Sequence, residues 1–502
     1  MSAGNVARAA GLVLGLCAQA AAQSYSSCPD FRTEGIHEKI DCIEALFSAA
    51  PAHLTFSSVP PSNGFALGGV LEQQTHYVSP ANRLPDIDIS DPSKRADTGY
   101  LSLTDALLGG AVSTNGSWYM TGSFSWLPPL HYTTVTEHGV NYQKLGPLKT
   151  HQVFGIQLYG THRSIQNLSF FGEGSTAGAT GYVFKQTETY AGATARLPLT
   201  AWLTAVGQAE YRQISLPADN ASNSVQSNFT GATVPGLNGQ PGFMHYTLAA
   251  ETDATWRSEP ASPPETLSQA PGASASALLK HRFIFRLQNR AGYDWYQDLN
   301  TALYSFRQFG FEGDESLHLG AVFLKYLPDK SHPATFAFLR FVCGGTGRKV
   351  KAKSAGAIGD SFKKDDVCDF GQFDVKSRVA VSQTGAGSVV PFYYQPTLGG
   401  SDIDSRVTLR GYPDYRFRGN DLALMQLEYS KPIPALDPIG IFAFYDGGTV
   451  SAPGQSLGMA TFRQDGGLGA SLRLQGKIVI QAYAAMGAGH GVHLGYNLEK
   501  LF

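Results

Sequence analysis

Arg410, Glu428 and Asp446 are the residues whose types and spacing best suit a specific chemical contact. A guanidinium group presents a planar fork of donors that binds carboxylates through paired hydrogen bonds, and it does not lose its charge. Glu428 lies near the end of one apolar–polar alternating segment, and Asp446 lies in the next one. One arginine with two carboxylates on neighbouring segments predicts a partly buried ion-pair cluster.

The alternation in these two segments places both carboxylates on the same kind of face. Successive side chains of a strand point to opposite faces, so Asp446 shares a face with Phe444, and Glu428 shares one with Gln426. The opposite faces carry the apolar residues Met425, Leu427, Tyr429, Ile441 and Tyr445. Neighbouring strands would therefore offer Arg410 two carboxylates on their polar faces. The alternative is that Arg410 lies on an ordinary turn and Asp446 ends a hairpin strand.

The rest of the chain supplies the strands that would hold these residues. Alternating segments are predicted around 154–158, 203–212, 283–288, 422–430, 439–447, 468–474, 478–485 and 491–502, with proline or glycine in many of the connections. Charged residues such as Glu210, Arg212 and Arg286 occupy the polar face, which suits a watery lumen better than a dry core. After the N-terminus there is no apolar run of about 18 residues, so a membrane crossing would have to be made by a β-barrel. The predicted fold class is all-β: one closed transmembrane antiparallel barrel, with a short N-terminal amphipathic helix.

The pattern of the C-terminal segment also predicts a membrane-spanning strand. Tyr496, Leu498 and Phe502 share one apolar face, and an aromatic residue at the very end of such a strand resembles the sorting signal of bacterial outer-membrane barrels. Lys500 departs from the usual pattern. The competing interpretation is a half-buried strand of a soluble sandwich.

The charged cluster and its neighbours resemble a known family when taken in order. The tip Arg410-Gly411-Tyr412, the strand with Glu428, and the later Phe444-x-Asp446-x-Gly448 resemble the bacterial surface antigen superfamily, the BamA/TamA-type insertase and two-partner-secretion barrels. The resemblance implies that the tip folds back inside the barrel and that Asp446 receives Arg410. It also implies a barrel of sixteen strands and location in the bacterial outer membrane. The motifs cover roughly residues 395–502.

The N-terminal region divides into two short parts before the barrel. Residues 1–22 combine Arg8, an apolar core and small residues, which is typical of an export signal. Residues 23–62 contain a predicted amphipathic helix at 36–47, with Ile36, Ile40 and Ile43 on one stripe. The barrel is predicted to occupy 63–502. About 40 residues separate the signal from the first strand, too few for the family's polypeptide-transport-associated modules.

The cysteines that remain after export form two local pairs. Cys28 with Cys42 and Cys343 with Cys368 are the expected disulfides, although four thiols allow three connectivities. The second pair would close a long, basic, glycine-rich loop. Its spacing does not match a zinc site, and no histidine lies within it.

Charge and motifs narrow the function classes. The formal net charge is −2, and it becomes −3 when Arg8 leaves with the signal, which argues against a nucleic-acid partner. The sequence lacks a Gly-x-Ser-x-Gly elbow, a His-Glu-x-x-His pair and a complete phosphate-binding loop, so it is expected not to be an enzyme and to need no cofactor or metal. Expected partners are outer-membrane lipid, the barrel-assembly machinery during biogenesis, and a protein or lipid client of unknown identity.

Two functions from different classes remain open at this point. The first is outer-membrane biogenesis or translocation of protein or lipid, through a weak seam between the first and last strands. The second is a transport pore plugged by the 36–47 helix and the Arg410 loop, or a structural surface barrel without insertase activity.

Overall fold

The computed structural model of the chain describes residues 52–59, 63–78, 82–83, 95–137, 140–145, 154–258, 279–323, 327–328, 361–362, 367–433, 439–474, 477–487 and 491–498, except for positions 176, 177, 179, 201, 404, 405 and 453. The predicted signal, the 36–47 helix, Cys28, Cys42, Cys343 and Phe502 lie outside these ranges. Cys368 lies in a strand, but its side chain is not described.

Antiparallel strands make up almost all of the described chain. The long strands are β1 (Ala52–Val59), β2 (Asn63–Val78), β4 (Arg95–Ser113), β5 (Trp118–Glu137), β7 (Gly155–Phe170), β8 (Tyr182–Pro198), β9 (Leu203–Ser215), β10 (Gly242–Arg257), β11 (Leu279–Asp298), β12 (Phe306–Phe323), β15 (Val367–Thr384), β18 (Leu422–Pro432), β19 (Ile439–Val450), β20 (Arg463–Leu474), β21 (Lys477–Gly487) and β22 (Gly491–Leu498). Shorter elements are β3 (Asn82–Arg83), β6 (Val140–Leu145), β13 (Leu327–Pro328), β14 (Ser361–Phe362), β16 (Thr397–Leu398), β17 (Phe417–Arg418), α3 (Val225–Asn228), η4 (Phe392–Tyr394) and η6 (Met459–Thr461).

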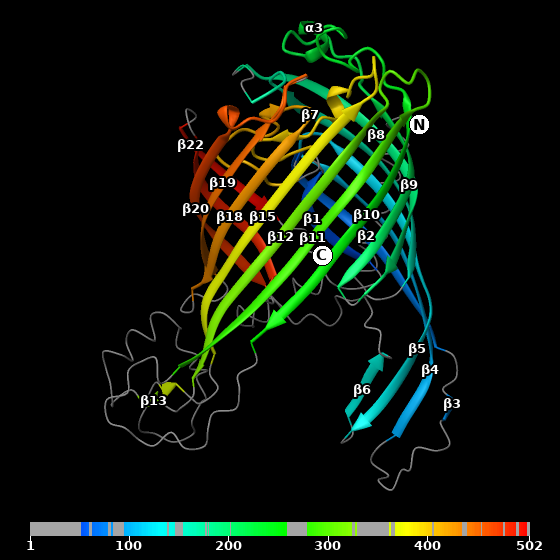
Figure 1. Ribbon diagram of the computed structural model, residues 1–502, viewed down its shortest axis with the longest axis vertical. Coiled ribbons are helices and arrows are strands. Elements are labelled where there is room, and N and C mark those ends of the chain that lie inside the picture. The colour runs from blue at the N-terminus through cyan, green and yellow to red at the C-terminus, as the bar shows by residue number, and fades with distance from the viewer. Residues whose placement is uncertain are drawn as a thin grey trace, which may run out of the picture.

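The long strands pair in chain order into one curved wall (Figure 1). Leaving aside the short β3 and β6, sixteen strands of the eighteen-stranded sheet each pair with the next along the chain. This confirms the prediction of an all-β antiparallel fold, which was based on the alternating segments of the sequence. Among the described residues, no helix is long and apolar enough to cross a membrane.

Two details of the predicted barrel are wrong. The sheet begins at Ala52 rather than near residue 63, because the eight-residue segment between Pro51 and Pro60 pairs with β2. The closed barrel is also not found, since no ladder joins β1 to β22 in the part of the chain that is described. The two strands do approach each other, with Cα atoms within 8 Å. The sheet therefore curls round until its two edges are neighbours, but no ladder joins them.

The outer face of the wall carries a band of exposed apolar side chains. On β10 the band runs from Tyr246 through Leu248 to Trp256, while the adjacent His245 and Thr247 are buried on the inner face. Ten residues at ~3.4 Å rise give about 34 Å along the strand, or about 26 Å across a membrane for a strand tilted by ~40°. Other members are Phe65, Leu108, Phe124, Leu158, Tyr211, Phe283, Phe309, Phe373, Met425, Tyr429, Ile441, Tyr445, Leu468, Val492 and Leu494.

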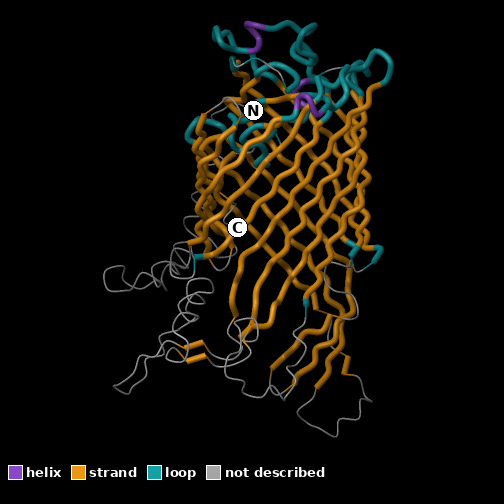
Figure 2. The backbone as a smooth tube through the Cα atoms, turned by 60° about the vertical axis from the view of Figure 1, so that its left-hand side comes forward, coloured by secondary structure: helices purple, strands orange, loops and turns teal. Residues whose placement is uncertain are grey.

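One end of the wall is covered by loops that pack on one another (Figure 2). Their core joins Phe170 and Phe184 from β7 and β8 with Val225 of α3 and Phe392 of η4. The β7–β8 loop also reaches strands at the other end of the sheet, where the Ser175 hydroxyl donates to the Val450 carbonyl at 3.0 Å. These contacts bring segments that are far apart in sequence together across the interior.

Candidate functional site

Arg410 and Asp446 form the centre of the site. Arg410 lies in the connection between β15 and β18, and Asp446 lies on the inner face of β19. The Nε and Nη2 groups of Arg410 donate to Oδ2 and Oδ1 of Asp446, each at 2.8 Å. The Arg410 backbone N–H donates to Oδ2 at 3.3 Å. Asp446 is fully buried and Arg410 is 5% exposed, so the pair is well shielded from water.

Glu428 supplies the second carboxylate. The Arg410 Nη1 group donates to Glu428 Oε2 at 2.5 Å, from the neighbouring strand β18. Gln426, one inward position earlier, donates to Asp446 Oδ1 at 3.1 Å and to the Thr408 carbonyl at 2.9 Å. The structure thus brings together the three charged residues singled out from the sequence, because the alternation of β18 and β19 points both carboxylates inward.

Phe444 forms the floor beneath the guanidinium. The Arg410 Cζ atom lies 3.5 Å from the centroid of the Phe444 ring, and the ring is 7% exposed. A cation over an aromatic face in a desolvated setting contributes on the order of 2 kcal/mol. The aromatic residue two positions before Asp446 therefore has a direct electrostatic role at this site.

The two motif glycines allow close approach of backbones. A Cβ at Gly411 would lie 2.7 Å from both Asp465 Cβ and the Gly487 backbone nitrogen. A Cβ at Gly448 would lie 2.8 Å from the Ala423 carbonyl oxygen and 2.9 Å from Leu398 Cδ1. Neither position has room for a side chain, so the loop tip and the receiving strand can meet only with glycine there.

Tyr412 anchors the tip after Gly411. Its side chain is 1% exposed, packs edge-on against Phe417 with ring centroids 5.2 Å apart, and its hydroxyl donates to the Gln464 carbonyl at 3.3 Å. The cluster around it includes Leu398, Leu409 and Leu422. The turn after Gly411 is thus held both by the packing of the Tyr412 ring on Phe417 and by the hydrogen bond of the Tyr412 hydroxyl.

The same connection is fastened at further points that the sequence did not single out. Asp402, fully buried, pairs with Arg378 on β15, and Arg406 pairs with Glu312 on β12 at 2.7 Å. The alternation of side chains along β12 and β15 could have identified Arg378 and Glu312 as inward-facing charges. No local sequence pattern marks their loop partners, Asp402 and Arg406.

Arg418 of β17 is a buried cation in an aromatic setting. It donates to the Phe392 carbonyl and lies 5.7–6.0 Å from the centroids of Phe170, Phe184 and Phe392. Burial lowers the pKa of Arg418 to about 10 and raises the pKa of the nearby Glu173. Glu173 accepts a hydrogen bond from Gln395 at 3.0 Å. The loops that cover this end of the wall are thus held together by buried charged residues as well as by apolar packing.

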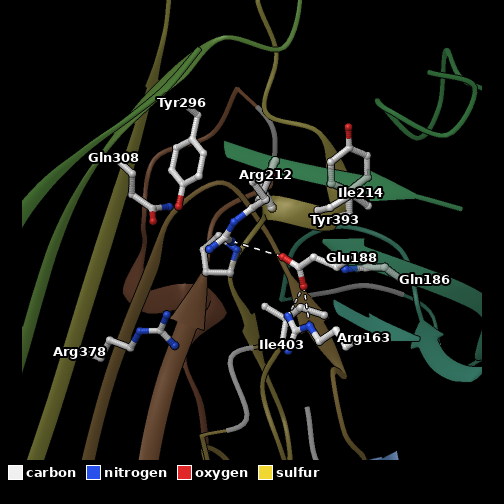
Figure 3. A pocket seen from close by; sticks show the side chains of 12 residues that line it. Arg163, Gln186, Glu188, Arg212, Ile214, Tyr296, Gln308, Arg378, Tyr393 and Ile403 are labelled. Carbon is white, nitrogen blue, oxygen red and sulfur yellow. Dashed lines mark hydrogen bonds and ion pairs between the residues drawn. The ribbon is translucent and has the colours of Figure 1, made fainter. Parts of the chain in front are cut away.

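A second polar region lies on the inner wall, apart from the cluster of Arg410, Asp446 and Glu428, which we call the lock. Arg163, Glu188, Arg212, Glu210, His245 and Asp294 form a row of contacts across β7 to β11. Figure 3 shows Glu188 between Arg163 and Arg212, with Arg378 facing the same space. This space is a cavity of about 80 Å³, closed on the loop side by Tyr393, Tyr394 and Ile403. Its charged lining is suited to water and small polar solutes.

The remaining sequence predictions fall mostly outside the described chain. Tyr496 lies on β22 with its side chain 65% exposed, and Leu498 is the last residue of that strand. Phe502 and three of the four paired cysteines lie outside the described residues, so the sorting signal and the disulfides stay predictions. Within the described ranges, no group of three or more His, Cys, Asp or Glu residues could hold a metal ion.

Comparison with known proteins gives structural likenesses at low sequence identity. No protein-family model matches the chain, and no curated protein matches it. The crystal structure of BamA from Haemophilus ducreyi lacking POTRA domains 1-3 aligns at 11% identity and a TM-score of 0.43, covering 91% of this chain and 76% of that one. CdiB from Acinetobacter baumannii aligns at 11% identity and a TM-score of 0.37, covering 88% of this chain and 59% of that one. Scores this low do not establish a shared fold, so the architecture rests on the strand ladders above.

Proposed function

We propose that this chain is a bacterial outer-membrane β-barrel of the surface antigen type that works in outer-membrane biogenesis or in translocation of protein or lipid. The observation that carries the proposal is the internal connection fastened through Arg410 to Asp446 and Glu428. Such a lock holds a long connection inside a curved wall, where it can respond to movement of the strands that bear the carboxylates.

The outer face supports insertion in a membrane. The exposed apolar band on β10 spans about 26 Å after allowance for tilt, close to the ~25 Å band of outer-membrane barrels. The inner face carries buried or half-buried charges such as Glu188, Glu210 and Arg212. The sheet thus has an apolar outer face and a charged inner face. A soluble sandwich has the opposite arrangement, because its charged face meets bulk water.

The edges of the sheet support a role in handling other chains. β1 and β22 lie close together without a ladder between them in the described chain. Unpaired backbone groups are costly in lipid, and an exposed strand edge can pair with an incoming strand. A client strand at this seam would satisfy both edges, and this is the step we assign to the protein.

Reconstitution tests the proposal directly. The chain would be placed in phosphatidylcholine vesicles, and the folding rate of an added unfolded outer-membrane barrel would be followed. Faster client folding than in empty vesicles is expected, and a disulfide engineered between β1 and β22 should abolish the acceleration. A chain that leaves client folding unchanged, with or without the cross-link, contradicts the insertase assignment.

A plugged transport pore is the second candidate, and the charged cavity beside η4 favours it. A cavity of about 80 Å³ between the loop and the wall could admit water or small ions. Single-channel conductance in planar bilayers separates the two functions: a pore should conduct more after deletion of residues 24–50, whereas an insertase should keep low conductance in both forms.

A further inference from the structure

A second aspartate faces Asp446 directly. Asp465 on β20 is the register partner of Asp446 on β19. The two carboxyl groups lie within hydrogen-bonding reach of each other, and Asp465 is only 4% exposed. Neither carboxyl oxygen of Asp465 has a hydrogen-bond partner among the described residues. A buried carboxylate without a donor is costly, so the protonation of Asp465 needs an explanation.

The side-chain donors of Arg410 and Gln426 are already committed to other acceptors. Arg410 gives its Nε, Nη2 and backbone N–H groups to Asp446 and its Nη1 group to Glu428. Gln426 also donates to Asp446. The Gly411 backbone N–H lies close to Asp465 and is directed at its carboxyl group. One guanidinium therefore faces three carboxyl groups, and two of those groups use its donors.

We propose that Asp465 is protonated in the folded protein and donates its O–H to the Asp446 carboxylate, so that the aspartate pair is a proton-dependent latch for the loop tip at Gly411. Two carboxyl groups that share a site do not both ionise readily, because each charge opposes the other. The proton satisfies the orphaned oxygen of Asp465 and leaves one negative charge on the pair. Ionisation releases that proton to solvent and breaks the hydrogen bond.

The other titratable groups around the pair come from four elements. They are Arg410 and Asp414 of the connection, Glu428 of β18, Tyr483 of β21 and, beyond Asp414, His493 of β22. Arg410 is the cation that acts on Asp465, and its side-chain donors are directed to Asp446 and Glu428. Ionised Asp465 would thus add a second carboxylate beside Asp446 without gaining a donor.

The sign of the pH effect follows from proton counting. The folded chain keeps a proton on Asp465 that an exposed aspartate in the unfolded chain releases at neutral pH. Stability falls with rising pH wherever the folded state binds more protons. The latch is therefore complete in mild acid and weakens as the pH rises. This inference concerns the loop anchor and holds whichever function the barrel performs.

Replacing each aspartate by asparagine distinguishes the role of Asp465 as proton donor from the role of Asp446 as the carboxylate that binds Arg410. Asp465→Asn mimics the protonated acid, so this variant should fold, raise the urea midpoint at about pH 8 and flatten its dependence between about pH 5 and pH 9. Asp446→Asn removes the charge that Arg410 binds, so it should lower the midpoint across the whole range. Asp253→Asn, on an exposed luminal pair with Arg286, is the control and should leave the slope unchanged.

Infrared spectroscopy of the unmodified protein gives a second readout. A carbonyl band of a buried protonated carboxyl group is expected in mild acid, and it should disappear in Asp465→Asn. Absence of that band in the unmodified protein overturns the proposal, even if a variant fails to fold. The same holds if Asp465→Asn lowers the midpoint as much as Asp446→Asn and keeps the full pH slope.

Discussion

Arg410 binds Asp446 through two parallel hydrogen bonds of 2.8 Å, although the residues are 36 positions apart in the chain. The fork-to-fork geometry fixes both the distance and the orientation of the loop tip, which a point charge could not do. The tip of the β15–β18 connection therefore lies at one defined place on the inner wall, against Phe444.

A double-mutant cycle should show that this pair is strongly coupled. Arg410→Ala leaves buried carboxylates without their cation, and we expect a loss of about 3 to 5 kcal/mol in the free energy of unfolding. Arg410→Lys should restore only part of this, because lysine lacks the planar fork. Coupling between Arg410 and Asp446 below about 0.5 kcal/mol in urea unfolding would contradict the lock. The exposed pair of Arg286 and Asp253 is the control, with coupling of ~0 to 1 kcal/mol.

Gly411→Ala should loosen the tip through steric overlap alone. The new Cβ would lie 2.7 Å from the Gly487 backbone nitrogen, and backbone cannot move aside as a side chain can. We expect a loss of about 1 to 3 kcal/mol. Gly310→Ala on β12 is the matched control: its Cβ would meet nothing within 4 Å, and a change within ~0.5 kcal/mol is expected. Equal losses in the two variants would refute the close-approach argument.

Adjacent residues on β7 test which face meets lipid. Leu158 is 51% exposed on the outer face, while Gln157 is exposed on the inner one. Leu158→Arg should lower the free energy of unfolding in vesicles, by about 2 to 4 kcal/mol at mid-depth and by less near an edge of the apolar band, because a charge would enter that band. Gln157→Arg should change stability by no more than about 0.5 kcal/mol. If the two costs are the same in vesicle refolding, the inside and outside faces are wrongly assigned.

The disulfide prediction can be checked without a structure of the loops. Non-reducing peptide mapping should recover Cys28 joined to Cys42 and Cys343 joined to Cys368. By loop entropy each bridge should contribute about 3 kcal/mol. Free thiols or crossed pairs in the exported protein would disprove the local pairing.

Deletion of Phe502 should reduce insertion without affecting export. The aromatic end of the last strand is expected to be read by the barrel-assembly machinery, so the truncated chain should accumulate in the periplasm. Cell fractionation with folding-sensitive electrophoresis measures both steps. A normal outer-membrane yield would mean that Phe502 is no sorting signal, and Lys500→Ala serves as the control within the same segment.

The sequence by itself determined which side chains share a face. A strand has a side-chain period of two, so the alternation in residues 422–430 and 439–447 placed Glu428 and Asp446 on one side before any contact was known. The resemblance of the tip Arg410-Gly411-Tyr412 to a known family then pointed to Arg410 as their partner, and the chemistry of a guanidinium suits that role. Periodicity also gave the antiparallel strands of the second half of the chain, because each segment carries its own pattern.

Only the tertiary structure decided what lies across the interior. Ser175 reaches Val450, Asp402 meets Arg378, and Asp465 faces Asp446, yet the loop residues among these sit in no repeating pattern. Their partners depend on how far the wall curves and where the connection crosses it. The absence of a β1–β22 ladder among the described residues has the same origin, since closure depends on the summed twist and stagger of all the strands and no single segment encodes it.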